Sequence, residues 1–239
     1  MKAMLLAAGF GTRLKPFTDH YPKALAEVNN KTLLQHNIKY LQQFGVYNVI
    51  VNVHHFAGQI INSIKKNNGW GSTIEISDET DAILETGGGL KRASWYFKTE
   101  GDFVLMNCDV LTDLPLYEMI KFHKEKNPLA TLATTNRETS RYFLFTKEGV
   151  LCGWKNVRTG EEKIMRQQDE LTAKAFSGIH IINTKIFELM QQTEQKFSMV
   201  DIYLSLCTSN NILSFDHSNS KFIDVGKPES LQQAAQLFL

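Results

Sequence analysis

The feature that most constrains this chain is an apolar run near its start that ends in two closely spaced glycines. Residues 3–8 read AMLLAA, and a Gly-Phe-Gly-Thr-Arg segment follows at residues 9–13. Six apolar residues have the length of a buried parallel strand, and two glycines after it let the backbone turn sharply, with N–H groups against phosphate oxygens. Arg13 and Lys23 add positive charge there. The segment therefore predicts a binding loop for the phosphates of a nucleotide.

Two better-known glycine-rich motifs do not fit this segment. A dinucleotide-binding fingerprint needs a third glycine where the chain has Leu14, and an acidic residue at the end of the second strand. That strand, predicted at residues 48–53, is followed by His54 and His55, and no Walker A pattern occurs. The combination present, LAAGFGTRL at residues 6–14 with PKAL at 22–25, resembles the signature of sugar-1-phosphate nucleotidyltransferases.

Length and composition set the broad class. At 239 residues and 27.2 kDa we expect one domain over residues 1–239. The 26 basic and 25 acidic residues are spread along the chain, which argues against a nucleic-acid partner. No apolar run approaches the ~20 residues of a membrane helix, so no membrane partner is expected. Three cysteines without zinc or disulfide spacing indicate free thiols of a cytoplasmic protein.

The order of apolar runs predicts an α/β fold. Helical spacing at residues 32–44 and 56–66, around strands at 47–53 and 73–77, gives a βαβ arrangement with a mixed, mostly parallel sheet flanked by helices. Alternating runs at 142–145 and 150–154 predict a small antiparallel insertion, followed by a polar loop at 156–162. The resemblance implies a Rossmann-like nucleotide-diphospho-sugar transferase fold.

Three successive glycines, Gly87 to Gly89, stand where a helix is expected to begin. They could form an ordinary flexible turn, because glycine is common in loops. We favour a loop without side chains that lets a base or sugar approach the backbone N–H groups. The form LETGGG at residues 84–89 resembles that of bacterial N-acetylmuramate-1-phosphate uridylyltransferases. Related mannose- and heptose-1-phosphate guanylyltransferases carry similar loops.

Two aspartates follow the ends of apolar runs, Asp109 after residues 102–106 and Asp224 after Phe222-Ile223. A carboxylate just past the end of a parallel strand lies where α/β sheets hold ligands, and its charge suits a metal on phosphates. Asp109 could instead cap the next helix. The resemblance implies that Asp109 and Asp224 share Mg²⁺, although Cys108 stands where the family pattern has glycine. The seven histidines form no metal-ligand motif.

The resemblance implies that an NTP and a sugar 1-phosphate give an NDP-sugar and pyrophosphate. The attacking phosphate oxygen is already anionic, so the site needs alignment and charge neutralisation rather than a base. The residues expected to act catalytically are Arg13 on the β and γ phosphates, Lys23 on the α-phosphate, and Asp109. The other expected nucleotide-binding residues are Leu6, Ala7, Ala8, Gly9, Gly11, Thr12, Glu79, Gly87 and Gly88, and the expected sugar-binding residues are Glu85, Asn107, Ser177 and Gly178.

The substrates are the least constrained part of this hypothesis. The 84–89 segment and the short chain favour UTP with N-acetylmuramate 1-phosphate, and GTP with mannose or heptose 1-phosphate stays open. A cytidylyltransferase acting on a polyol or phosphocholine, and a non-catalytic regulatory relative, are further alternatives. Association into a homo-oligomer also stays open.

Overall fold

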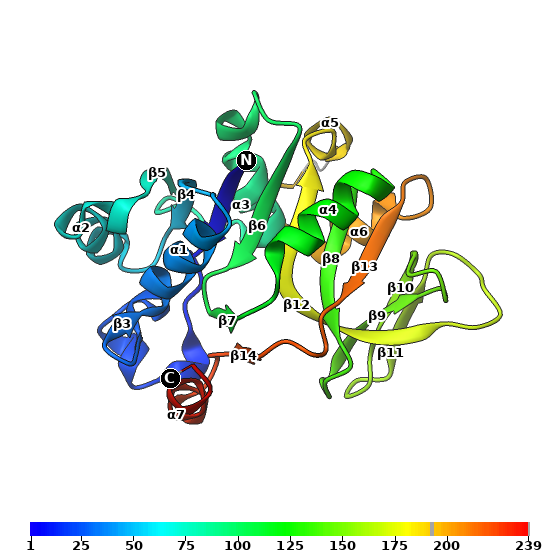
Figure 1. Cartoon of the computed structure of the whole chain (residues 1–239). Helices are drawn as coiled ribbons and strands as arrows, with labels where there is room; N and C mark the ends of the chain where they lie inside the picture. The colour runs from blue at the N-terminus through cyan, green and yellow to red at the C-terminus, as the bar shows by residue number, and fades with distance from the viewer. Residues whose placement is uncertain (192–193, 239) are drawn as a thin grey trace.

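A ten-stranded mixed sheet crosses the molecule, with helices on both of its faces (Figure 1). The computed structural model describes residues 1–191 and 194–238. Four parallel strands form one half of the sheet, in the order β6 (Asp102–Asn107), β1 (Lys2–Leu6), β4 (Asn48–Val53) and β5 (Thr73–Asp78). The mixed, mostly parallel α/β core expected from the sequence is confirmed.

The other half of the sheet is built on one long strand, β12 (Thr172–Asn183), which runs antiparallel to β6. It also pairs with β8 (Ala130–Thr135) from Ala175 to Ile182, and β8 pairs with β13 (Ile212–Asp216). Its first half carries the antiparallel insertion β9 (Arg141–Phe145), β10 (Leu151–Asn156) and β11 (Glu161–Ile164). The predicted polar loop is therefore shorter than expected, because β11 already pairs with β10 from Glu161.

The helices cover the two faces of the sheet in two groups. One face packs against α1 (Leu33–Gln43), α2 (Ala57–Lys66) and α4 (Leu116–Lys126), and the other against α3 (Glu85–Arg92), α5 (Ile186–Leu189) and α6 (Met199–Leu206). Leu5 of β1 faces the first group and its neighbour Met4 the second. Strands buried on both faces read as continuous apolar runs, as the first strand does.

The C-terminal segment packs beside this sheet. The short strand β7 (Val110–Thr112) pairs antiparallel with β14 (Phe222–Asp224), which leads into α7 (Pro228–Leu237). Leu14, Leu111, Val225 and Ala234 share a third apolar cluster. The remaining elements are the ladder of β2 (Glu27–Val28) with β3 (Lys31–Thr32) and the 3-10 helices η1 (Thr12–Leu14), η2 (Phe17–Asp19), η3 (Lys23–Leu25), η4 (Asn68–Gly71) and η5 (Ser94–Phe97).

The predicted loop at Gly87 to Gly89 is wrong, because all three glycines lie inside α3. The N–H groups of Gly87 and Gly88 both donate to the Phe197 carbonyl, at 2.9 and 3.1 Å. A Cβ on Gly88 would stand 2.1 Å from the Gln195 carbonyl oxygen. The glycines therefore serve close packing of α3 against residues 195–197, and these two N–H groups are not aimed at a ligand.

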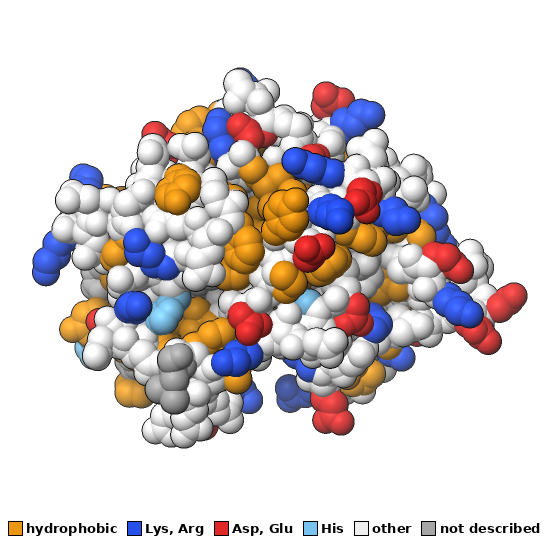
Figure 2. All heavy atoms as spheres, in the orientation of Figure 1, with side chains coloured by type: hydrophobic (Ala, Val, Ile, Leu, Met, Phe, Trp, Pro, Cys, Tyr) orange, Lys and Arg blue, Asp and Glu red, His pale blue; other side chains and the backbone are white. Residues whose placement is uncertain are grey.

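The surface carries both signs of charge. Acidic and basic side chains are intermixed on the face that Figure 2 shows, with apolar side chains exposed between them. Among residues 1–191 and 194–238, no helix combines the length and the apolar character needed to cross a bilayer.

Candidate functional site

A cavity of about 300 Å³ opens at the carboxyl ends of the parallel strands. Ligands bind at this edge in open α/β sheets, and the volume is at the lower end of that of ligand pockets. Nine of the predicted site residues line it, namely Leu6, Ala7, Ala8, Gly9, Lys23, Glu79, Glu85, Asn107 and Asp109. Phe10, Ala24, Asn52, Ile83, Thr86 and Cys108 complete the lining.

The two glycines after β1 have separate roles. Gly11 has φ +63°, and a Cβ there would stand 2.9 Å from Cβ of Lys23 and 3.0 Å from Cγ2 of Thr18. Only glycine suits that combination of left-handed backbone and close packing. Gly9 has no atom within 4 Å of the place a Cβ would take, so it leaves open space at the cavity wall. Thr12 and Arg13 then begin the exposed turn η1.

A series of buried, hydrogen-bonded polar groups forms part of the cavity lining. The Ala7 N–H donates to Asn52 Oδ1 at 2.7 Å, and Asn52 Nδ2 donates to Glu79 Oε1 at 2.8 Å. Burial raises the pKa of Glu79, and the Asn52 hydrogen bond opposes that shift. Sequence reasoning missed Asn52, although a single polar residue among four valines and isoleucines of β4 was a usable signal.

The two predicted metal ligands come together through the β7–β14 ladder. Asp224 pairs with Val110, the neighbour of Asp109, and the Val225 N–H donates to the Asp109 carbonyl at 2.8 Å. Lys23 forms an ion pair with Asp109. Burial, and then the charge of Asp109, raise the pKa of Asp224. Two carboxylates thus face one region of the site, where a cation offsets their repulsion.

Arg13 reaches the same region from η1. A Cβ on Gly226 would stand 2.8 Å from Asp224 Oδ1 and 2.9 Å from Arg13 Nη2, so both side chains lie against this glycine. The positive charges of Lys23 and Arg13 favour the ionised form of Asp224. The structure therefore brings Arg13 and Asp224 beside Lys23 and Asp109, and the last two line the cavity.

The chemistry of these carboxylates fits magnesium. Mg²⁺ is held in many phosphate-transfer sites by one or two carboxylates, with substrate phosphates and waters as the other ligands. Asp109 and Asp224 supply two hard oxygen donors of this kind. In the part of the chain that the structure describes, no cluster of three or more His, Cys, Asp and Glu side chains could hold a metal by protein ligands alone.

The predicted sugar residues are only partly brought together. Gly178 has φ +72°, and a Cβ there would stand 2.5 Å from Asn107 Nδ2, so the glycine lets β12 lie against the Asn107 side chain. Ser177 is buried and bonded to His217 Nε2 at 2.8 Å rather than lining the cavity. Glu85 lines the cavity with φ +59°, a costly backbone for this residue type.

Cys108 replaces the family glycine without crowding the site. Its side chain is 2% exposed within the apolar core, and its carbonyl accepts from Asn37 Nδ2 at 2.9 Å. Burial and the charge of Asp109 raise the pKa of its thiol. A thiol held in its protonated form is a poor nucleophile, so Cys108 serves packing.

Comparison with known proteins agrees with this geometry. The family model described as "Nucleotidyl transferase" matches residues 2–239. A mannose-1-phosphate guanyltransferase of Yarrowia lipolytica is 29% identical over 242 residues, and one of Aspergillus oryzae is 28% identical over 243. Each match covers all of this chain but 64% of the relative, so the chain spans less than two thirds of their length.

Solved structures share the fold. A putative glucose-1-phosphate thymidylyltransferase from Bacillus anthracis superposes with a TM-score of 0.84 at 16% identity, covering 99% of this chain and 94% of the other. HddC from Yersinia pseudotuberculosis, complexed with GMP-PN, gives 0.79 at 24% identity, covering 100% and 99%. The chain belongs to the nucleotidyl transferase family, the membership predicted by its resemblance to sugar-1-phosphate nucleotidyltransferases.

Proposed function

We propose that this protein joins an NTP to a sugar 1-phosphate, giving an NDP-sugar and pyrophosphate, with UTP and N-acetylmuramate 1-phosphate as the substrate pair. The observation that carries the reaction is that Arg13 and Asp224 gather beside Lys23 and Asp109, which line a cavity together with Asn52 and Glu79. The site thus has charged groups for phosphates and hydrogen-bonding groups for a base.

The reaction is an attack of the sugar-phosphate oxygen on the α-phosphorus of the NTP. The P–O bond to the β-phosphate breaks, and pyrophosphate leaves with the electron pair. Because the attacking oxygen is anionic, no side chain has to remove a proton. Lys23 holds the α-phosphate and Arg13 the β and γ phosphates, so that the charge moving to pyrophosphate meets fixed positive groups. Asp109 and Asp224 would hold Mg²⁺, whose bound charge neutralises the phosphate oxygens.

The part of the cavity proposed to bind the base offers backbone at residues 6–8 and the Glu79 carboxylate. Uracil has one N–H donor on its pairing edge between two acceptors, and that donor can be given to Glu79. A buried acceptor that loses its donor costs free energy, which is how such pockets discriminate between bases. UTP is favoured here by the resemblance of the LETGGG segment to uridylyltransferases. Glu85 and Thr86 of this segment also line the cavity.

GTP with mannose 1-phosphate is the second candidate. Guanine presents two adjacent N–H donors, which complement a carboxylate such as that of Glu79, and the curated relatives are mannose-1-phosphate guanyltransferases. Heptose 1-phosphate is the corresponding alternative acceptor.

A substrate matrix tests both proposals. UTP, GTP, CTP, dTTP and ATP are each paired with N-acetylmuramate, mannose and heptose 1-phosphates, and pyrophosphate release is measured. We expect the highest kcat/KM for UTP with N-acetylmuramate 1-phosphate. A preference for GTP with mannose 1-phosphate would replace the proposed substrate pair. If neither these pairs nor CTP with phosphocholine released pyrophosphate, the proposed reaction would be overturned.

A further inference from the structure

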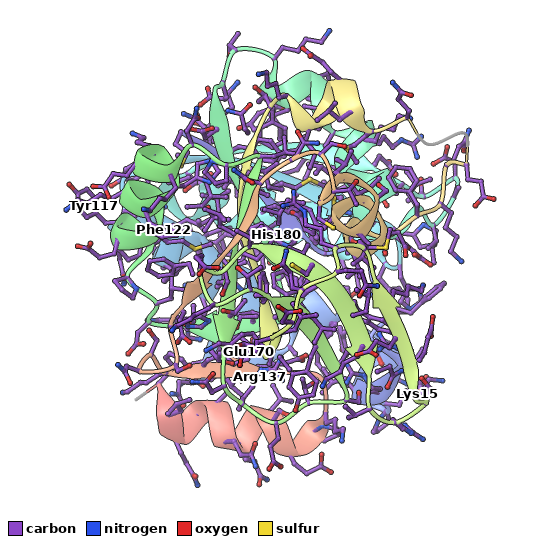
Figure 3. All side chains as sticks on the ribbon, turned by 90° about the vertical axis from the view of Figure 1, so that its right-hand side faces the viewer. Lys15, Tyr117, Phe122, Arg137, Glu170 and His180 are labelled. Atoms are coloured by element: carbon purple, nitrogen blue, oxygen red, sulfur yellow. The ribbon has the colours of Figure 1, made fainter. Side chains whose placement is uncertain are left out.

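Arg137 is a half-buried cation outside the cavity lining. It lies just after β8, and Figure 3 shows it on the α7 side of His180. Its Nη2 donates to the Phe176 carbonyl at 2.9 Å, while its Nε is buried without a hydrogen-bond partner. Within residues 1–191 and 194–238 it forms no ion pair. Burial lowers the pKa of Arg137, which reflects the cost of a charge kept from water.

The position of Arg137 relates it to the phosphate end of the site. Its guanidinium lies over the Phe222 ring, 5.1 Å from the ring centre. Phe222 and Asp224 are two residues apart on β14, so their side chains share one face of that strand, about 7 Å apart along it. Arg137 and Asp224 also interact electrostatically. An anion at Arg137 would therefore lie roughly the width of a sugar ring from the proposed metal ligands.

Two more buried polar atoms without partners accompany Arg137. His217 is 4% exposed, stacks edge-on against Phe222 at 5.8 Å, and has no partner for Nδ1. Thr135, two residues before Arg137, is 5% exposed and has no partner for Oγ1. Buried polar atoms are normally hydrogen-bonded, so the unpaired atoms of Arg137 and His217, both of which lie against the Phe222 ring, call for an explanation.

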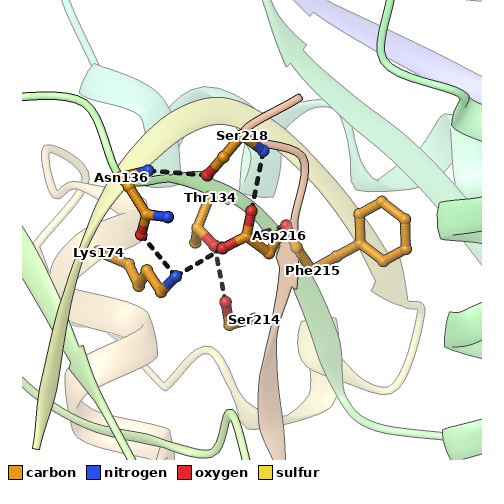
Figure 4. A network of polar contacts seen from close by, with 7 residues as sticks. All are labelled: Thr134, Asn136, Lys174, Ser214, Phe215, Asp216 and Ser218. Carbon is orange, nitrogen blue, oxygen red and sulfur yellow. Dashed lines mark hydrogen bonds and ion pairs between the residues drawn. The ribbon is translucent and has the colours of Figure 1, made fainter. Parts of the chain in front are cut away.

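The backbone that carries Arg137 is firmly held, as Figure 4 shows. The N–H of the preceding residue, Asn136, donates to Ser218 Oγ at 3.0 Å, and Lys174 Nζ bonds both Asn136 Oδ1 and Asp216 Oδ2. Thr134 Oγ1 bonds Ser214 Oγ at 2.7 Å. The charge of Lys174 is thus already paired with that of Asp216.

We propose that Arg137, supported by His217, is a specificity-determining residue that binds a carboxylate carried on the ring of the acceptor sugar. This inference rests on the proposed function, because N-acetylmuramate bears such a carboxylate on its lactyl ether, and mannose does not. A guanidinium fork binds carboxylate with directed, charge-assisted hydrogen bonds. The substrate carboxylate would then form the direct ion pair that Arg137 does not make with the described residues.

The test compares two acceptors that differ only in the lactyl group. KM and kcat are measured with UTP for N-acetylmuramate 1-phosphate and N-acetylglucosamine 1-phosphate, on wild type, Arg137→Gln, Arg137→Lys and Arg141→Gln. Arg141 is an exposed arginine at the start of β9 and serves as the matched control. Binding of both acceptors is also measured by calorimetry, so that the comparison does not depend on turnover.

Arg137→Gln should raise KM for the muramate acceptor ~10–100-fold, the worth of a hydrogen bond to a charged group, with KM for UTP unchanged. The glucosamine acceptor should change less than about 3-fold, Arg137→Lys should recover part of the loss, and Arg141→Gln should match wild type. An equal rise in KM for both acceptors would assign Arg137 to their shared phosphate and overturn the proposal. Equal affinity of wild type and Arg137→Gln for the muramate acceptor would overturn it as well. Wild type that turns over only GTP with mannose 1-phosphate would overturn the proposed substrates. The calorimetry still decides the role of Arg137.

Discussion

Lys23 forms an ion pair with Asp109, 86 positions further along the chain, at the edge of the cavity. The pair places a positive charge beside two carboxylates and beside the segment at residues 6–9. In the proposed reaction, Lys23 stabilises charge on the α-phosphate while its neighbour Asp109 would hold the metal. The two roles are coupled, because removing the lysine leaves Asp109 and Asp224 to repel each other.

Lys23→Ala should therefore lower kcat more than it raises KM for the nucleotide. Negative charge around the α-phosphorus is redistributed toward the transition state, and a group that meets it there contributes mainly to kcat. Steady-state kinetics measure the split, with Lys15→Ala as control, because Lys15 is exposed and pairs only with Asp19 among the described residues. A rise in KM at constant kcat would show that Lys23 provides uniform binding instead.

Asp109→Asn and Asp224→Asn should each lower turnover at least ~10²-fold in the presence of magnesium, the scale of losing one preorganised charge-stabilising group. Asn keeps the shape of the side chain but not its charge, so the loss reports on metal binding rather than packing. Asp169→Asn, an exposed aspartate, is the control. Near-normal turnover of both variants would show that neither carboxylate holds a metal needed for the reaction.

Local sequence order predicted the strand ends, and with them most of the cavity. The apolar runs at residues 3–8 and 102–106 correspond to strands that end at Leu6 and Asn107, so Gly9 and Asp109 could be placed after strand ends from short segments. The β7–β14 ladder could not be predicted from short segments, because its strands have three residues each and pair across more than a hundred positions. Asp109 and Asp224 are adjacent only through that ladder.

The glycines of α3 show the opposite case. Three glycines are unfavourable in a helix, and propensity alone predicts a loop. Contacts with a distant segment decide the outcome, because Gly87 and Gly88 bond the Phe197 carbonyl and leave no space for a Cβ. The position of Arg137 could not be predicted either, since its relation to Phe222 and Asp224 depends on strands far apart in the sequence.

His180 makes stability depend on acid pH. It is buried in β12, bonded to the Tyr203 hydroxyl at 2.6 Å, and burial lowers its pKa from 6.5 to about 3. The unfolded chain therefore takes up a proton near pH 6.5 that the folded protein takes up only near pH 3. Stability is full above pH 6.5 and falls as the pH drops toward 3, by about 2–3 kcal/mol at pH 4.5 for this group.

Urea unfolding of wild type and His180→Gln at pH 7 and pH 4.5 measures this dependence. The variant should be less stable at pH 7, because Gln packs less well, and the difference should shrink at pH 4.5, because Gln does not titrate. His20→Gln, at an exposed histidine, should follow wild type at both pH values. A constant difference between wild type and His180→Gln would show that His180 does not remain neutral in the folded protein.

Asn52 links β4 to the part of the cavity proposed to bind the base. It accepts from the Ala7 N–H and donates to Glu79, and all three line the cavity. Asn52→Ala leaves the Ala7 N–H and the Glu79 carboxylate without these partners, a cost of about 1–3 kcal/mol. We expect lower stability and an approximately 10-fold higher KM for the nucleotide, with KM for the sugar phosphate unchanged.

Asn52→Asp sharpens this prediction. It places a second carboxylate beside Glu79, whose pKa burial already raises, so one of the two groups must stay protonated or the pair must repel. The loss of nucleotide binding should therefore be larger than for Asn52→Ala at neutral pH and should lessen as the pH is lowered. Asn48→Ala, at an exposed position of the same strand, controls for changes in β4. Equal effects of Asn52→Ala and Asn52→Asp at every pH would show that Glu79 and Asn52 support the strand without positioning the base.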